Sequence, residues 1–321
     1  MIVTLVSFSN IAVYSAMAIY TLAFIMFTLD LARRSAPAPV RLDVEHNAAS
    51  ASSGSTKLLE RLTTDAPADP AKKTPRYLRI AMSLTVIAWV LHVSADVMRG
   101  LAAGRVPWAN MFEFSLTATA IIVGVFLAVQ FWQDLRFLGV FVTGFVLIAL
   151  GIATVNFYVD VVPLPPALQS AWLVIHVFVA SLGTGFFALG AALSVVQLLQ
   201  ARREAGKAAR LNFLDTLPAA DRLENLAYRV IVVGFVLWTF TLIAGAVWAE
   251  RAWGRYWGWD TKEVWTFIIW TIFAGYIHAR ATRGWRGPRS AVLALVGFGA
   301  VLFNFTIVNL FFKGLHTYSG L

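Results

Sequence analysis

The chain contains the stretch Trp253-Gly254-Arg255-Tyr256-Trp257-Gly258-Trp259-Asp260-Thr261-Lys262-Glu263 between two hydrophobic segments, at roughly 226–248 and 264–281. Each segment is close to the ~20 residues that a helix needs to cross a bilayer. Six of the twelve tryptophans lie between Trp248 and Trp270. We therefore expect an aromatic loop, residues 249–263, that joins two transmembrane helices at one membrane surface.

The rest of the chain has the composition of a polytopic membrane protein. Of its 321 residues, 59% are hydrophobic, and the mean hydropathy is +0.71. Lipid cannot satisfy exposed backbone N–H and C=O groups, so the spans should be helices. The sequence predicts an all-α membrane helix bundle of about eight transmembrane helices, at roughly 7–30, 78–99, 112–132, 137–157, 171–199, 226–248, 264–281 and 290–311.

The basic residues indicate how the bundle is oriented. Alternate connections hold 20 of the 26 Lys and Arg residues, namely 31–79, 133–136, 200–229 and 280–289. The positive-inside rule places these connections in the cytoplasm, so both termini and loop 249–263 should lie on the outer side. The net charge of +9 then reflects topology, and it gives no reason to expect a nucleic-acid partner.

Three regions follow from this topology: residues 1–34 form the first helix, 35–77 a flexible cytoplasmic linker, and 78–321 the main membrane domain. The linker is rich in Ala, Pro, Ser and charged residues and has too little apolar material to fold. The chain contains no cysteine, which excludes thiol chemistry by the protein itself. A metal site would therefore use His, Met, Tyr or carboxylates.

Two histidines are expected on the same face as the aromatic loop. His176 begins the fifth span near its outer end, and His316 lies in the outer tail. Two axial imidazoles suffice to hold haem iron, because the porphyrin fills the equatorial positions. Trp253, Trp257 and Trp259 would add contact area to the macrocycle. The sequence thus predicts an outer bis-histidine haem site.

A third histidine, His278, lies about 14 residues into the seventh span and so in the inner half of the membrane. An ionisable residue there is a functional candidate and should face the bundle interior. Arg280 follows it and could either meet a haem propionate or serve as a positive-inside anchor.

Simpler interpretations exist for several of these residues. Asp260 and Glu263 have the spacing of a capping box that starts the next helix. Arg255 and Arg251 could pair with propionates, or they could reach the membrane interface. An interfacial aromatic belt accounts well for the remaining tryptophans near span ends, namely Trp108, Trp172 and Trp248. His92 is expected to make only a structural hydrogen bond.

The run Trp253–Trp265 resembles the tryptophan-rich "WWD" signature of haem-handling proteins. Together with Tyr276–Arg280 and the ending Gly314–Gly320, it is similar to the CcsA family (CcsB or ResC in some bacteria), the membrane subunit of the System II cytochrome c synthase. The resemblance covers most of 78–321 and implies transport of haem b across the cytoplasmic (inner) membrane. It also implies presentation at the outer loop for covalent attachment to the Cys-x-x-Cys-His segment of apocytochrome c.

The resemblance assigns roles to the histidines. His278 matches the family's transmembrane ligand, and His176 and His316 match the two outer ligands. It further implies a second membrane subunit of the CcsB/ResB type, with which the chain would form a synthase. Three alternatives stay open: a System I haem-handling protein such as CcmC or CcmF, a bis-histidine electron-transfer subunit, and a solute transporter with a structural tryptophan belt.

Overall fold

The computed structural model describes residues 2–34, 75–161, 169–208, 211–282 and 285–316. Within these ranges the regular structure is entirely helical, as predicted. The eight long helices are α1 (Ile2–Arg34), α3 (Arg76–Ala103), α4 (Met111–Val129), α5 (Gly139–Asn156), α6 (Ala171–Glu204), α7 (Ala220–Trp253), α8 (Thr261–Ala281) and α9 (Pro288–Phe305). The short helices are η1 (Arg136–Leu138), η3 (Asn212–Thr216) and α10 (Ile307–Phe311).

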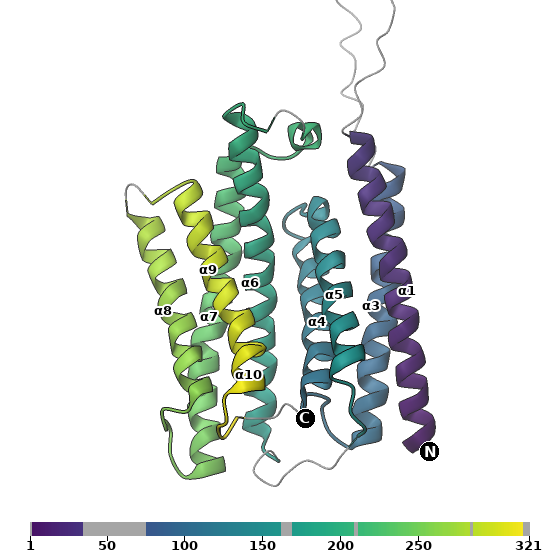
Figure 1. The fold of residues 1–321 in the computed structure, drawn as a ribbon, viewed down its shortest axis with the longest axis vertical. Helices are drawn as coiled ribbons and strands as arrows, with labels where there is room; N and C mark the ends of the chain where they lie inside the picture. The colour runs from purple at the N-terminus through teal and green to yellow at the C-terminus, as the bar shows by residue number, and fades with distance from the viewer. Residues whose placement is uncertain (1, 35–74, 162–168, 209–210, 283–284, 317–321) are drawn as a thin grey trace, which may run out of the picture.

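Each of the first seven predicted spans coincides with one long helix, and the eighth, 290–311, covers α9 and the short helix α10. Seven of the described helices are long and apolar enough to cross a membrane, so the protein is a multi-pass membrane protein. The exception is α8, whose 21 residues include His278 and Arg280 near its end. It nevertheless packs against α7 and α9 and runs beside them (Figure 1).

The long helices form two groups that stand side by side (Figure 1). One group contains α1, α3, α4 and α5, and the other contains α6, α7, α8 and α9. The groups meet mainly where α4 packs against α6. The start of α1, the α3–α4 connection, the α7–α8 connection and α10 all lie at one end of the bundle, hereafter the tryptophan-loop end.

Local interactions explain why the chain turns where it does at this end. Asp260 caps α8, and its side chain with that of Glu263 forms the predicted capping box. Asn110 caps α4 by accepting a hydrogen bond from the Glu113 N–H at 2.9 Å. Gly254 ends α7 in the left-handed conformation (φ 69°), which glycine adopts without steric cost.

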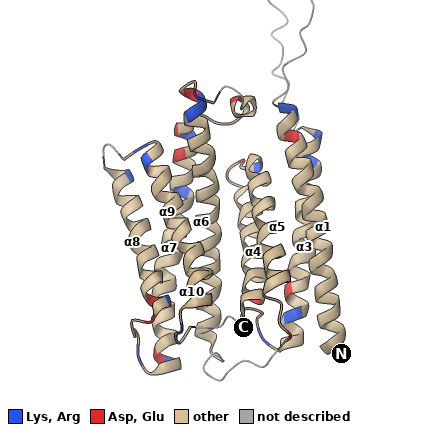
Figure 2. Ribbon diagram, viewed as in Figure 1, with Lys and Arg blue, Asp and Glu red and all other residues tan. Residues whose placement is uncertain are grey.

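Charged side chains lie mainly near the two ends of the bundle (Figure 2). This is the distribution expected of helices that cross hydrocarbon. Six basic residues, which the sequence grouped apart from the other twenty, lie in the connections and helix termini of the tryptophan-loop end: Arg99, Arg105, Arg251, Arg255, Lys262 and Lys313. The predicted linker 35–77 lies outside the described residues, except for its last three, within which α3 begins at Arg76.

Candidate functional site

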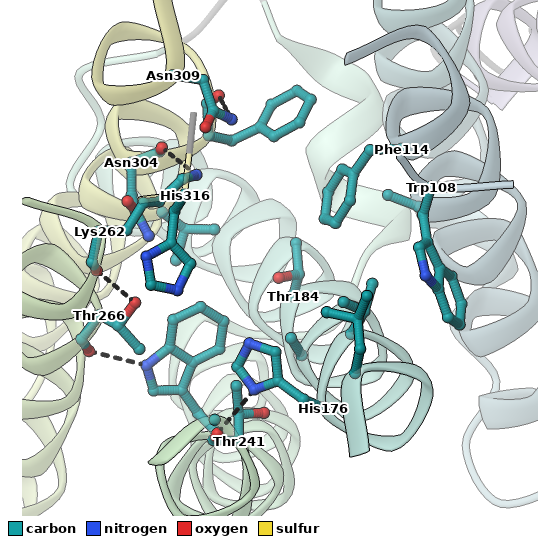
Figure 3. A pocket seen from close by; sticks show the side chains of 18 of the residues that line it. Trp108, Phe114, His176, Thr184, Thr241, Lys262, Thr266, Asn304, Asn309 and His316 are labelled. Atoms are coloured by element: carbon teal, nitrogen blue, oxygen red, sulfur yellow. Dashed lines mark hydrogen bonds between the residues drawn. The ribbon is translucent and has the colours of Figure 1, made fainter. Parts of the chain in front are cut away.

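A cavity of about 260 Å³ lies at the tryptophan-loop end, between the two helix groups (Figure 3). Side chains from α4 to α10 and from both connections at this end form its wall, which is largely apolar and aromatic. His176 and His316 both line it, although 140 positions separate them in the chain. The structure therefore brings together the two histidines that the sequence predicts to share a site.

His176 reaches the cavity from the second turn of α6. Its Nδ1 lies 3.0 Å from the carbonyl oxygen of Thr241 on α7. Gly245, one turn further along α7, leaves room for the ring, because a Cβ there would lie 2.7 Å from the His176 Cε1. The missing side chain at this position thus allows the imidazole to lie flat against α7.

His316 is held by Asp260, the capping residue of α8. Its Nδ1 lies 2.7 Å from the Asp260 Oδ2, and the Leu315 N–H donates to Oδ1 at 3.1 Å. The hydrogen bond from His316 keeps the pKa of the Asp260 carboxyl below its ordinary value. Asp260 therefore links the end of the α7–α8 connection to the segment that contains His316, and it holds His316 at the cavity.

Both histidines have the arrangement of metal ligands. A carbonyl oxygen and an ionised carboxylate only accept hydrogen bonds, so each Nδ1 donates, and the neutral form of each ring has its lone pair on Nε2. No hydrogen-bond partner for either Nε2 is found among the described residues. Metal-bound histidines commonly donate their other N–H to a carboxylate or carbonyl, which fixes the ring and raises its basicity.

Trp248 packs between the two imidazoles. Its ring centroid lies 6.0 Å from that of His176, nearly parallel, and 5.4 Å from that of His316, edge-on. The side chain is 1% exposed and lines the cavity. The interpretation of Trp248 as part of an interfacial belt is therefore wrong. Its helical spacing from Thr241 and Gly245 places it on the same face of α7.

The three tryptophans proposed from the loop occupy different positions. Trp257 lines the cavity. Trp253 packs edge-on against His316, with ring centroids 4.8 Å apart, and so lies behind it. Trp259 is 77% exposed, has a left-handed backbone (φ 58°) and contacts Trp257 edge-on. Trp108, assigned to the belt from sequence, also lines the cavity.

The basic residues differ from expectation as well. Arg255 is exposed and packs over Gly258, and it does not line the cavity. Lys262, which the sequence did not single out, does line it and donates to the Asn304 carbonyl oxygen at 2.9 Å. Lys262 lies two residues after the helix cap. No periodic pattern marks this position, so no signal in the sequence would have identified it.

His278 is exposed near the end of α8, far along the helix from the tryptophan loop. The expectation that it faces the bundle interior is wrong for this chain, because Phe273, Tyr276 and Arg280 take the buried face. Arg280 is buried and forms an ion pair with Glu224 at 2.7 Å, so its charge is paired inside the bundle. The assignment of His278 as a haem ligand stays a prediction.

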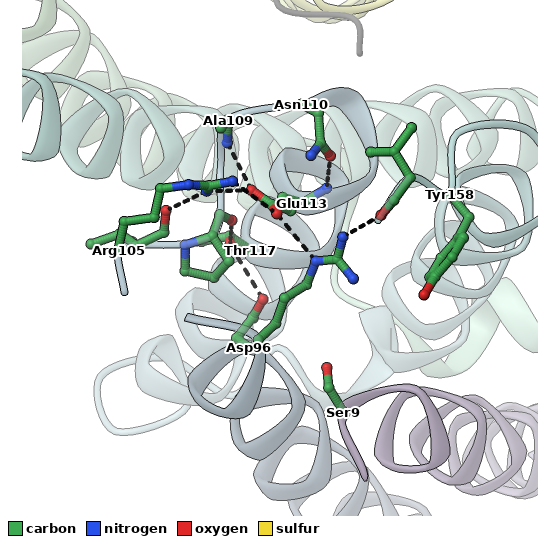
Figure 4. A network of polar contacts seen from close by, with 12 residues as sticks. Ser9, Asp96, Arg105, Ala109, Asn110, Glu113, Thr117 and Tyr158 are labelled. Carbon is green, nitrogen blue, oxygen red and sulfur yellow. Dashed lines mark hydrogen bonds and ion pairs between the residues drawn. The ribbon is translucent and has the colours of Figure 1, made fainter. Parts of the chain in front are cut away.

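A buried polar network lies at the start of α4, next to residues that line the cavity (Figure 4). Glu113, at the start of α4, accepts hydrogen bonds from Arg99 and Arg105, and also from the Ala109 N–H at 3.0 Å. Neither the Arg99 nor the Glu113 side chain is exposed. This network fixes the α3–α4 connection against the bundle, so that Trp108 reaches the cavity.

The described residues contain no group of three or more His, Asp or Glu side chains that could bind a metal ion alone. Two imidazoles on one cavity instead suit a metal whose remaining ligands belong to the bound molecule. A porphyrin iron is of this kind.

Comparison with known proteins gives the family. Residues 108–316, which include the whole cavity wall, match the model described as cytochrome C assembly protein. The chain belongs to this family. A cytochrome c biogenesis protein CcsA of Guillardia theta is 33% identical over 267 residues, covering 78% of this chain and 89% of that protein. The CcsA protein of Synechococcus elongatus is 35% identical, covering 68% and 81%.

The fold is similar to that of a solved structure, the cytochrome c haem lyase CcmF. The TM-score is 0.62 at 16% identity, and the match covers 94% of this chain but only 46% of that longer one. Within the cytochrome c assembly family the relatives named CcsA are matched over most of their length, which favours CcsA over the System I alternative.

Proposed function

We propose that this protein transports haem b across the cytoplasmic membrane and presents it in the cavity for attachment to apocytochrome c on the outer side. His176 and His316 would be the axial ligands of the iron. The observation that carries this proposal is the pairing of each Nδ1 with an acceptor, Thr241 or Asp260, which leaves both Nε2 lone pairs for a metal.

The walls suit a flat, largely apolar ligand. Trp248, Trp257 and Trp108 face the same cavity as the two imidazoles, and aromatic rings offer large contact areas to a macrocycle. The volume of about 260 Å³ is slightly below the ~300–1,000 Å³ of typical ligand pockets. The walls would therefore move apart to admit haem, as suits a transported substrate more than a permanent cofactor.

The covalent step belongs to haem and to the thiols of the apocytochrome, because this chain has no cysteine. The protein would position the substrate and exclude competing reactions. Trp259 and Tyr256 are exposed beside the cavity and would contact the incoming Cys-x-x-Cys-His segment. The chain would thus act as a subunit of a synthase.

His278 is proposed to hold haem within the membrane before transfer to the outer site. Its exposed position on α8 supports a site completed by another chain, namely a CcsB/ResB-type membrane subunit. Haem would pass from this shared site to the cavity at the tryptophan-loop end.

The test is the absorption spectrum of the detergent-purified protein, co-expressed with a ResB-type partner. Wild type should show the sharp reduced bands of bis-imidazole haem, and a His176→Ala/His316→Ala double variant should lose or shift them. His92→Phe is the control, because His92 is buried against Tyr20 away from the cavity. A double variant with an unchanged spectrum and normal cytochrome maturation would refute the ligand assignment.

A further inference from the structure

We propose that Lys262 binds a carboxylate of the cavity's ligand, namely a propionate of haem. This inference rests on the proposed function and assigns the cation that orients the substrate. Figure 3 shows Lys262 beside Asn304 and His316, across the cavity from Phe114 and Trp108. An anionic group bound to Lys262 would lie next to the hydrogen-bonded pair of Asp260 and His316.

Lys262 is the one Lys or Arg among the described residues of the cavity wall. Glu263 is the one carboxylate there, and it does not neutralise Lys262. Its Oε2 accepts hydrogen bonds from the backbone N–H groups of Gly258 and Asp260, at 2.8 and 3.0 Å. Within the described part of the chain, Lys262 forms no salt bridge.

Among the described residues, the Lys262 Nζ has one hydrogen-bond partner. An ammonium carries three N–H donors, and the hydrogen bond to the Asn304 carbonyl oxygen, 2.9 Å long, uses one. The remaining donors belong to a side chain on the wall of a largely apolar cavity. A charge in such surroundings is costly unless it is paired, so a bound anion would lower its free energy.

The position of Lys262 in its helix strengthens the argument. It lies in the first turn of α8, directly after Thr261. The helix dipole makes this end partially positive, which disfavours a cation and favours an anion. The Asp260 carboxylate offsets part of this charge, but it already accepts hydrogen bonds from His316 and from the backbone N–H groups of Leu315 and Lys262. Lys262 and the helix end together therefore form a site for a negative group.

Arg255 is the competing candidate for this role. It is exposed and lies over Gly258 outside the cavity wall. The structure thus favours Lys262 as the cation that contacts the substrate.

The experiment compares haem b with its dimethyl ester, in which both carboxylates are blocked. The full-length protein is titrated with each by absorption. Wild type should bind haem about tenfold more tightly than the ester, the scale of a hydrogen bond to a charged group. Lys262→Met should lose this preference, and Lys262→Arg should keep it. Lys313→Met is the matched control, since Lys313 is exposed at the same end of the bundle.

A Lys262→Met protein that keeps the wild-type preference overturns the inference, as does an Arg255→Gln protein that loses it. If Lys262→Met does not fold, Lys262→Gln replaces it, and the same ratio of the affinity for haem to the affinity for the dimethyl ester decides the test. Metal-free protoporphyrin IX separates the inference from the proposed function, because it keeps both carboxylates and has no iron. Lys262-dependent binding of protoporphyrin without bis-imidazole bands for haem would sustain the carboxylate contact and refute the iron ligands.

Discussion

Individual residues set the positions of the histidines, through glycines that leave room for neighbouring groups and through two acceptors, the backbone carbonyl of Thr241 and the carboxylate of Asp260. Gly245 gives the His176 ring its place, and Thr241 orients it. Gly314 does the same for the other ligand, because a Cβ there would lie within bonding distance of the Asp260 carboxylate. The position and the tautomer of the two imidazoles are therefore set before any substrate binds.

Gly245→Ala should weaken haem binding without unfolding the protein. The new Cβ would lie 2.7 Å from the His176 Cε1, so the ring must turn away from the cavity. We expect a fall in affinity of about tenfold or more, and loss of the bis-imidazole spectrum, by haem titration. Alanine in place of a helical glycine otherwise favours the helix by roughly 0.5–1 kcal/mol.

Gly299→Ala on α9 is the control, since a Cβ there would meet no atom within 4 Å. It should bind haem as wild type does. Equal spectra for the Gly245→Ala and Gly299→Ala proteins would show that His176 is not a ligand in this orientation.

At the scale of elements, the buried Glu113 network joins α3, the α3–α4 connection and α4. Arg99 and Arg105 both pair with one carboxylate, at 3.2 and 2.6 Å. Removing one partner of such a group leaves a charge that is buried and uncompensated, which costs far more than the pair contributes. The network thus determines how Trp108 approaches the cavity.

Glu113→Gln should lower the free energy of unfolding by about 3 kcal/mol, because the buried Arg99 loses the carboxylate with which it pairs. Thermal unfolding in detergent measures the loss. Asp134→Asn is the matched control: its pair with Arg136 is exposed, and such pairs contribute ~0–1 kcal/mol. Similar melting temperatures for the two variants would argue against a structural role for the network.

At the scale of the whole molecule, the two helix groups enclose the cavity at one end of the bundle, and the basic residues concentrate at the other. The side of the membrane that each end faces is a prediction from the positive-inside rule. The absence of cysteine makes the wild-type chain a ready background for labelling single introduced thiols.

A thiol at the tryptophan-loop end should react with a membrane-impermeant maleimide added to intact cells. Tyr256→Cys tests this end, and Trp285→Cys tests the opposite end, with parent side chains 63% and 45% exposed. We expect Tyr256→Cys to be labelled before lysis and Trp285→Cys only after it. The reverse pattern would invert the topology and place the cavity on the cytoplasmic side.

The sequence alone determined the helical class, the eight segments, the grouping of basic residues by end, and the Asp260–Glu263 cap. These features depend on segment length, composition and interactions within four residues, which are read without knowledge of the fold. Joint placement of His176 and His316 also followed from the sequence, because alternating spans return the chain to the same surface.

Which side chains face the cavity depends on how the helices pack together in three dimensions. In lipid both faces of a helix are apolar, so periodicity does not separate the interior face from the lipid face, and packing between helices sets the rotation. For this reason His278 lies on an exposed face and Trp248 on a buried one. Likewise, the sequence does not distinguish Lys262, which lines the cavity, from Arg255, which does not.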